Sequence, residues 1–169
     1  MVEQNQFRAA MARLGAAVNI VTTDGPAGRY GVAVSAVCSV TDDPPTVLVC
    51  INRISKANET LKANGVLCVN VLAGRHEALS SRFSTRAFSI TERFGDEALW
   101  TRLQTGSPVL TDASVALDCR IASYREVGTH SVFFGEVQKL QLADRAESLV
   151  YFNRSYHHLG ASAVADAQG

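Results

Sequence analysis

The segment from residue 52 to residue 65, NRISKANETLKANG, places polar and cationic side chains directly after a run of strand-forming residues. Ser55 is a favourable N-cap and Gly65 can end a helix in the left-handed conformation, so we expect a helix between them. The start of a helix carries unpaired N–H groups and a partial positive charge, which favour an anion. The polar and cationic side chains beside this start are Asn52, Arg53, Ser55 and Lys56. The stretch therefore suits a phosphate group, although the same residues also fit an ordinary capped helix with a solvated face.

A second candidate ligand surface is the stretch AVSAVCSVTDDPP, residues 33–45, in which the side chains stay small. Ser35 and Ser39 are interleaved there with Ala33, Ala36 and Cys38. Small side chains let a flat ring approach backbone N–H and C=O groups, and the hydroxyls add hydrogen-bond donors and acceptors. The alternative interpretation is tight packing inside a barrel, which requires no ligand.

Histidines are the remaining ionisable side chains of interest. His130 follows Gly128 and Thr129 at the entry to an apolar run, where it can donate a hydrogen bond to an anionic ring or hold a carboxamide. His157 and His158 are adjacent, so on a strand they point to opposite faces and make a poor metal site. Without HxH or HxxxH spacing, no metal site is expected.

Common catalytic and nucleotide-binding motifs are absent from the sequence. It contains no GxSxG elbow, no evident Cys and His pair, no GxGxxG and no GxxxxGK[ST]. Covalent hydrolysis, a Rossmann dinucleotide site and a nucleoside triphosphate site are therefore not expected. What remains is a site in which a bound organic cofactor carries the reaction, while the protein supplies donors, small surfaces and one histidine.

Composition favours one folded domain. The chain has 169 residues, of which 47% are apolar and 19% charged, and its 16 basic residues balance 16 acidic ones. We expect a single domain over residues 1–169, with an ordered core from about residue 6 to 160 and a tail from Gly160 that frays. The zero net charge favours neither nucleic acid nor an anionic membrane, and no apolar run approaches the ~20 residues of a membrane span. A soluble protein is expected.

The four cysteines lie far apart, at Cys38, Cys50, Cys68 and Cys119. They have no CxxC spacing, no signal peptide precedes them, and three lie inside apolar runs. We therefore expect buried, reduced thiols in a cytoplasmic protein.

Short strands follow one another at hairpin spacing along most of the chain. The pattern predicts strands near residues 18–22, 32–40, 46–52, 66–72, 114–121, 129–137 and 148–152, and short helices near 7–14, 55–65, 75–83 and 96–103. The strand at 32–40 is expected to be buried on much of both faces, and Ser114, Asp118 and Arg120 are expected on a solvated face. The pattern is typical of an antiparallel barrel decorated by short helices.

Several stretches occur together, and in the same order, in a known family. FRAAMARLGAAVNIVTTDGPAGRYG, SAVCSVTDDPPTVLVCINR, LCVNVL, ERFG, VGTHSVFFGEV and LVYFNRSYHHL resemble the short-chain flavin reductases, the reductase components of two-component flavin-dependent monooxygenases. The resemblance runs from about Phe7 to Leu159. Within the family, the sequence is most similar to the reductases that serve aromatic hydroxylases and to the reductase of pyrimidine utilisation. It implies a split β-barrel flavin-binding fold with antiparallel Greek-key topology, a homodimer, and reduction of FMN or FAD by NADH or NADPH.

Carried over position by position, the resemblance implies roles for individual residues. Those placed beside the isoalloxazine ring are Ser35, Ala36, Val37, Cys38 and Ser39. Those placed beside the flavin phosphate are Asn52, Ser55 and Lys56. Arg82 and Phe83 match an arginine and a phenylalanine at the phosphate and ring end, and Tyr156 matches a tyrosine that closes the pocket. His130 matches the histidine at the nicotinamide and flavin face and is the expected catalytic residue.

The function that this resemblance implies is NAD(P)H-dependent reduction of flavin, with the reduced flavin diffusing to a separate oxygenase. One alternative is a split-barrel flavoprotein that keeps FMN tightly bound and reduces another acceptor, which would stay yellow through dialysis. The other is a non-catalytic ligand-binding barrel or a structural dimer module, which would cause no flavin-dependent loss of NADH.

Overall fold

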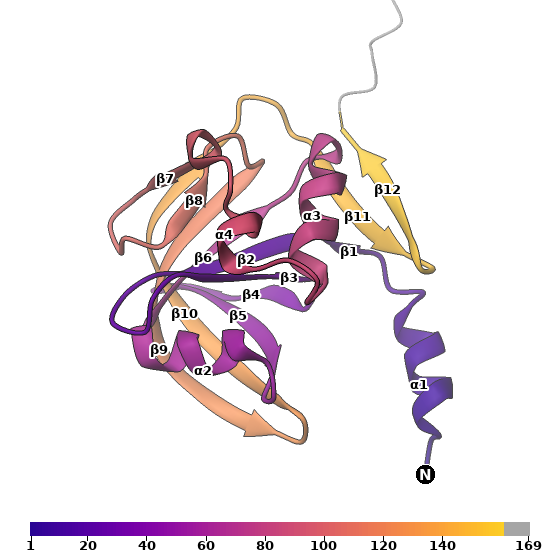
Figure 1. Ribbon diagram of the computed structural model, residues 1–169. Helices are drawn as coiled ribbons and strands as arrows, with labels where there is room; N and C mark the ends of the chain where they lie inside the picture. The colour runs from indigo at the N-terminus through magenta and orange to yellow at the C-terminus, as the bar shows by residue number, and fades with distance from the viewer. Residues whose placement is uncertain (161–169) are drawn as a thin grey trace, which may run out of the picture.

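A seven-stranded antiparallel sheet forms the centre of the structure (Figure 1). The computed structural model describes residues 1–160. Strand order in this sheet is β3-β2-β6-β9-β10-β5-β4, and every neighbouring pair is antiparallel. The strands are β2 (Asn19–Thr23), β3 (Tyr30–Val34), β4 (Val37–Asp42), β5 (Pro45–Asn52), β6 (Val66–Val71), β9 (Val115–Val127) and β10 (His130–Leu142). The predicted mainly-β, antiparallel architecture is confirmed.

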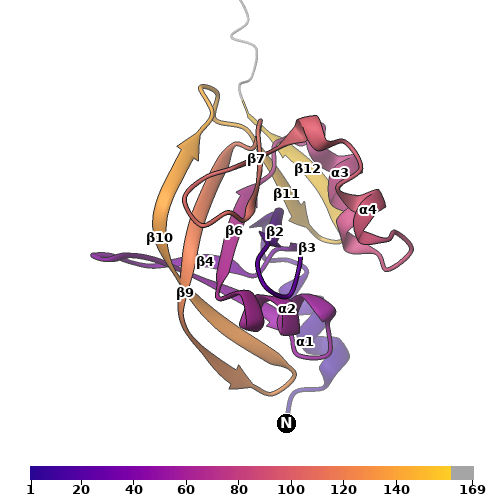
Figure 2. The ribbon, with the colours of Figure 1, turned by 60° about the vertical axis from the view of Figure 1, so that its left-hand side comes forward.

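Two smaller sheets and several short helices complete the described residues. β1 (Ala16–Ala17), β11 (Ser148–Phe152) and β12 (Ser155–Leu159) form one sheet, and β7 (Trp100–Arg102) and β8 (Pro108–Leu110) form the other. The helices are α1 (Gln4–Met11), α2 (Lys56–Asn64), η1 (Gly74–His76), α3 (Glu77–Ser84), α4 (Ile90–Arg93) and η2 (Glu97–Leu99). Figure 2 shows α3 and α4 on one side of the molecule, where both contact β3. The fraying expected from Gly160 concerns residues 161–169, which lie outside the described residues.

An aromatic cluster fixes α3 and α4 against β3. The rings of Phe83 and Phe94 meet edge to face with centroids 5.1 Å apart, and Trp100 packs against both. Phe83 lies so close to β3 that a Cβ added to Gly31 would be 2.6 Å from its Cε1 atom. Glycine at position 31 therefore allows α3 to pack directly on the strand, since any side chain there would displace the Phe83 ring.

The prediction of a single strand over residues 32–40 is wrong. The chain forms β3 and β4 with a break at Ser35 and Ala36, where the Val37 N–H donates to the Ser35 carbonyl at 3.0 Å. Within residues 1–160, β4 is the edge of the central sheet and pairs only with β5, so most of its residues are exposed rather than buried. Small and β-branched residues here mark an open sheet edge instead of an interior strand.

Two further predictions are corrected by tertiary contacts. Residues 96–103 form only the short η2 turn followed by β7, because β7 pairs with β8 and Trp100 joins the aromatic cluster. Asp118, predicted on a solvated face, is fully buried, and one of its carboxylate oxygens accepts a hydrogen bond from the Thr105 backbone N–H at 2.8 Å. Ser114, predicted on the same face, is also buried, and its hydroxyl donates to the Glu147 carbonyl at 2.5 Å. Arg120 is exposed, as expected.

The cysteines differ in burial from the sequence prediction. All four are free thiols, and Cys68 and Cys119 are buried, but Cys50 is half-buried and Cys38 is exposed on the β4 edge. The prediction failed for Cys38 because its strand has a neighbour on one side only. Among the helices described, none has the length and apolar character needed to cross a membrane.

Candidate flavin site

Three adjoining cavities follow β3. The α2 cavity, about 500 Å³, lies between the start of α2 and the loop that joins α3 to α4. The central cavity, about 290 Å³, lies between β3, β5 and the start of β10. The hairpin cavity, about 250 Å³, lies between β3, α3 and the β11–β12 hairpin. Val32 and Ser55 line the first two cavities, while Ser35 lines the last two, so the three adjoin one another and are together called the depression along β3.

The α2 cavity begins at the predicted helix start. Ser55 is the N-cap of α2, and its Oγ accepts a hydrogen bond from the Asn58 backbone N–H at 3.3 Å. The side-chain Oδ1 of Asn52 accepts from the Ile54 N–H at 3.1 Å, which orders the turn between β5 and α2. Lys56 lines the cavity with Ser55. The strand end, the cap and the cation thus meet at one end of the depression, as an anion site requires.

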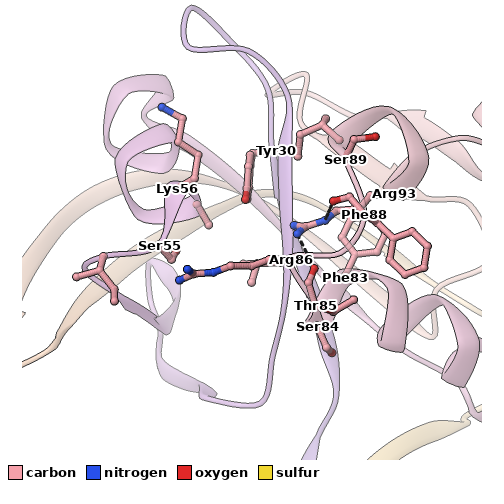
Figure 3. A pocket seen from close by; sticks show the side chains of 14 residues that line it. Tyr30, Ser55, Lys56, Phe83, Ser84, Thr85, Arg86, Phe88, Ser89 and Arg93 are labelled. Atoms are coloured by element: carbon pink, nitrogen blue, oxygen red, sulfur yellow. Dashed lines mark hydrogen bonds between the residues drawn. The ribbon is translucent and has the colours of Figure 1, made fainter.

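The opposite wall of the α2 cavity carries a second cation, Arg86. Figure 3 shows its side chain reaching from the α3–α4 loop across the cavity toward Ser55. The Lys56 ammonium group pairs with Glu59 of the same helix at 3.0 Å. Arg86 comes from a different element, so an anion at the Ser55 cap would lie between the start of α2 and the Arg86 guanidinium. The sequence reasoning missed Arg86, since nothing in residues 84–89 indicates which side chain of an irregular loop points inward.

Arg93 holds this loop in place. It is 5% exposed, and its guanidinium donates to the carbonyls of Thr85 at 2.7 Å, Phe88 at 3.2 Å and Gly31 at 2.8 Å. The first two acceptors belong to the α3–α4 loop, and Figure 3 shows these two hydrogen bonds. The third acceptor belongs to β3, so one buried cation ties the loop to the strand. The sequence did contain a signal for α4: Ser89 and Glu92 form a capping box, with the spacing typical of a helix start.

The central cavity contains the predicted histidine. His130 is the first residue of β10 and lies opposite Asn52 of β5 in the sheet register. It lines the cavity together with Ser35 and Ala36, and its Nδ1 lies 2.9 Å from the Thr129 hydroxyl. Burial raises the pKa of the Cys50 thiol in the same wall, and neighbouring Cys38 raises it further. That thiol is therefore neutral at physiological pH, and His130 supplies the ring nitrogens of this wall.

The hairpin cavity is closed by Tyr156. Its hydroxyl lies 3.1 Å from the Ser80 hydroxyl of α3, and both residues line the cavity with Ser35. His158, two residues further along β12, pairs with Glu77 of α3 through Nε2 and Oε2 at 2.8 Å. These two contacts dock the β11–β12 hairpin onto α3 and so fix the position of Tyr156.

The structure brings most of the predicted site residues to this depression. The central cavity is lined by Ser35, Ala36, Asn52, Ser55 and His130. The α2 cavity is lined by Ser55, Lys56 and Phe83, and the hairpin cavity by Ser35 and Tyr156. Phe83 is only 1% exposed, so its main contacts are in the aromatic cluster.

Four predicted residues do not line any of the three cavities. Val37 packs on the apolar core, and Cys38 and Ser39 lie on the exposed β4 edge. Arg82 is half-buried on α3, on the turn before the loop that carries Arg86. Their roles beside a flavin remain predictions. Among residues 1–160, no three His, Cys, Asp or Glu side chains gather as a metal site would require.

Residues 11–160 match the flavin reductase like domain, and the chain belongs to that family. A relative from Variovorax paradoxus, the FMN reductase (NADH) RutF, is 54% identical over 155 residues, which cover 92% of this chain and 85% of the relative. A crystal structure of a putative flavin reductase from Haemophilus somnus has 46% sequence identity and a TM-score of 0.89, covering 94% of this chain and all of that one. The styrene monooxygenase flavin reductase from Pseudomonas putida is 26% identical with a TM-score of 0.80, covering 92% and 98% of the two chains. These matches confirm the predicted family and its split-barrel fold.

Replacing Arg93 with alanine should release the α3–α4 loop. The variant loses three hydrogen bonds from a buried cation to backbone carbonyls, so we expect its free energy of unfolding to fall by about 3 kcal/mol. Trypsin should also cleave the folded variant after Arg86 faster than it cleaves the wild type. Urea denaturation and timed proteolysis with mass spectrometry measure both effects. Exposed Arg145 provides the control variant Arg145→Ala, and equal cleavage rates after Arg86 in all three proteins would refute the role of Arg93.

Proposed function

We propose that this protein is an NADH-dependent FMN reductase. The observation that carries the proposal is the 54% identity, over nearly the whole chain, to a relative named for that activity. The depression along β3 supports it, because a flavin nucleotide needs an anion site and a flat, uncharged wall within the length of one molecule. Ser55, Lys56 and Arg86 have the chemistry proposed for the anion site, and Ser35 and Ala36 have the small side chains proposed for the wall.

In the proposed complex, each part of FMN meets a different cavity. The phosphate lies in the α2 cavity, between the first turn of α2 and Arg86. The ring lies along the central cavity, where small residues and the neutral Cys50 thiol leave the ring face free. Tyr156 closes the depression beyond Ser35. Flavin and nicotinamide supply the redox chemistry, in which a hydride passes from NADH to the flavin.

The protein's task in this proposal is positioning and electrostatics. Hydride transfer requires the two rings to stack at roughly 3–3.5 Å, so the wall must leave room for the nicotinamide to enter over the flavin. His130 stands at the edge of that wall, where an N–H can stabilise negative charge that develops on the flavin or hold the nicotinamide carboxamide. No side chain has to form a covalent bond with either substrate.

The reduced flavin is proposed to leave and supply a separate oxygenase. The styrene monooxygenase reductase, a structural relative, is named as the flavin reductase of such a system. A depression open along β3 suits release of the product better than an enclosed cavity does. We place the protein in the cytoplasm, where its four free cysteines would remain reduced.

The protein is also proposed to form a homodimer. Phe7, Met11 and Leu14 near the N-terminus are 56%, 43% and 60% exposed, and α1 buries none of its residues. α1 stands clear of the central sheet in Figure 1. The β4 edge is likewise exposed, with Val40 46% accessible. An apolar helix face and an open strand edge on one chain are the surfaces that a second copy covers.

A spectrophotometric assay tests the proposed activity. Purified protein, dialysed free of flavin, should oxidise NADH only after FMN is added, and more slowly with NADPH. Parallel reactions with FAD and riboflavin rank the acceptors. The absorbance of NADH at about 340 nm reports the rate, and apoprotein without flavin is the blank. Absence of flavin-dependent NADH loss would remove the proposed function, while protein that stays yellow through dialysis would favour a tightly bound flavin.

The variant Arg86→Ala should weaken the binding of FMN more than the binding of riboflavin. Loss of one charge-assisted hydrogen bond to phosphate, worth roughly 1.5 kcal/mol, is expected to raise the KM for FMN about tenfold. The KM for riboflavin, which has no phosphate, should change less than about twofold. Arg145→Ala again serves as the control, with both KM values expected to match the wild type. Equal changes for FMN and riboflavin would place the phosphate away from Arg86.

Light scattering tests the homodimer. The expected mass is twice the chain mass of 18.1 kDa. The double variant Phe7→Glu, Met11→Glu should shift the mass toward that of a single chain, because burying two carboxylates in an apolar interface is unfavourable. A single-chain mass for the wild type at micromolar concentration would contradict the proposal.

A further inference from the structure

Glu126, at the end of β9, is the centre of a hydrogen-bond and ion-pair network beside the candidate site. Its Oε1 accepts from Lys62 Nζ of α2 at 2.6 Å. Its Oε2 accepts from Arg53 Nε at 2.8 Å and from the Ser131 hydroxyl at 3.0 Å. The hydrogen bond from Lys62 is the largest cause of a lowered pKa for this carboxyl. Desolvation opposes it and is second in size, while the Ser131 hydrogen bond and the charges of Lys62 and Arg53 lower the pKa further. The side chain is therefore ionised at neutral pH.

The network reaches the start of α2 through buried groups. Ser131 is fully buried and Asn58 is 1% exposed. The Asn58 amide donates to the Ser131 hydroxyl at 2.8 Å and to the Ile51 carbonyl of β5 at 3.1 Å. The backbone N–H of the same asparagine is capped by Ser55. Glu126, Ser131, Asn58 and Ser55 thus form a continuous chain of contacts from the β9–β10 hairpin to the α2 cavity.

Arg53 makes a second connection from the same carboxylate. While its Nε binds Glu126, its Nη1 donates to the Gly128 carbonyl at 3.2 Å. Its backbone N–H donates to the Thr129 carbonyl at 2.9 Å. Gly128 and Thr129 form the turn immediately before His130. The Glu126 carboxylate therefore orients Arg53, which is hydrogen-bonded to the turn that precedes His130.

We propose that Glu126 is a positioning residue that fixes His130 relative to the bound flavin. It touches neither substrate in this assignment, and acts by holding the β9–β10 turn against the β5–α2 junction. The two ends of the network differ in their dependence on Glu126. The start of α2 keeps its Ser55 cap and the Asn58 contact to β5 without it, whereas the turn before His130 loses the orientation of Arg53. The inference rests on the proposed function, since His130 is assigned there to hydride transfer.

The loss of Glu126 should therefore affect the hydride step more than flavin binding. For Glu126→Gln we expect kcat/KM for NADH to fall about tenfold, because a small displacement of a catalytic group is costly. The KM for FMN should stay within about twofold of the wild type. The kinetic isotope effect with NADH deuterated at C4 should rise as hydride transfer becomes slower. Ser131→Ala removes the hydrogen bond that helps to fix Oε2 of Glu126, the oxygen that binds Arg53, so it should change the same parameters in the same direction.

A double-mutant cycle separates positioning from a general structural effect. In the His130→Ala background, Glu126→Gln should have almost no further effect on kcat/KM for NADH, because the group it positions is gone. Glu97→Gln is the matched control, since it removes an exposed ion pair to Arg29 at 3.1 Å that does not contact the network. Thermal unfolding of every variant confirms that the proteins compared are folded.

The outcomes distinguish the inference from the function on which it rests. A wild type that does not oxidise NADH with FMN would remove the proposed function. An active wild type whose Glu126→Gln and Ser131→Ala variants match Glu97→Gln would overturn the positioning role and leave the function standing. Full additivity of Glu126→Gln with His130→Ala would also overturn it, because the two residues would then act independently.

Discussion

The antiparallel register between β5 and β10 is the constraint on which the site depends. It sets His130 opposite Asn52, so the last residue of one strand and the first of the other meet at one corner of the sheet. Asn52 leads into the turn capped by Ser55, and His130 follows the β9–β10 turn. A slip of one residue would turn every side chain of β10 to the other face of the sheet. Correct pairing of these strands therefore places the anion site and the histidine beside the same wall.

The other wall of the depression depends on packing rather than on strand register. The aromatic cluster of Phe83, Phe94 and Trp100 fixes α3 and α4 on β3, and Gly31 allows the close approach. Arg93 then anchors the irregular loop between the two helices through backbone carbonyls. A loop held in this way can present Arg86 at a fixed place, which a solvent-exposed loop without anchors could not do.

Charge in this protein is local. The chain has zero net charge, so it produces no long-range field that would attract an anionic ligand. Lys56 and Arg86 instead provide cations at one end of the depression, while the wall near Ser35 and Cys50 is neutral. Such an arrangement orients a molecule that has an anionic end and a flat uncharged end.

The sequence by itself determined the local features of the fold and part of the site. The Ser55 cap, the Gly65 helix end and the strands around residues 46–52 and 66–72 were predictable, because caps and alternating apolar residues depend on neighbours close in the chain. The resemblance of whole stretches to one family added residues that lie far apart, including His130 and Tyr156. The mainly-β antiparallel fold followed from the hairpin-spaced strand pattern, and the family and its split barrel followed from the resemblance.

Only the tertiary structure decided which strands are edges, which polar groups are buried and which loop cation faces the cavity. Asp118 is buried because Thr105 provides a hydrogen-bond partner for its carboxylate. Cys38 is exposed because β4 has no second strand beside it in the described sheet. Arg86 points inward because Arg93 anchors the loop that carries it. Local sequence carries no record of these neighbours, because the same residue type is stable in either environment until its partners are in place.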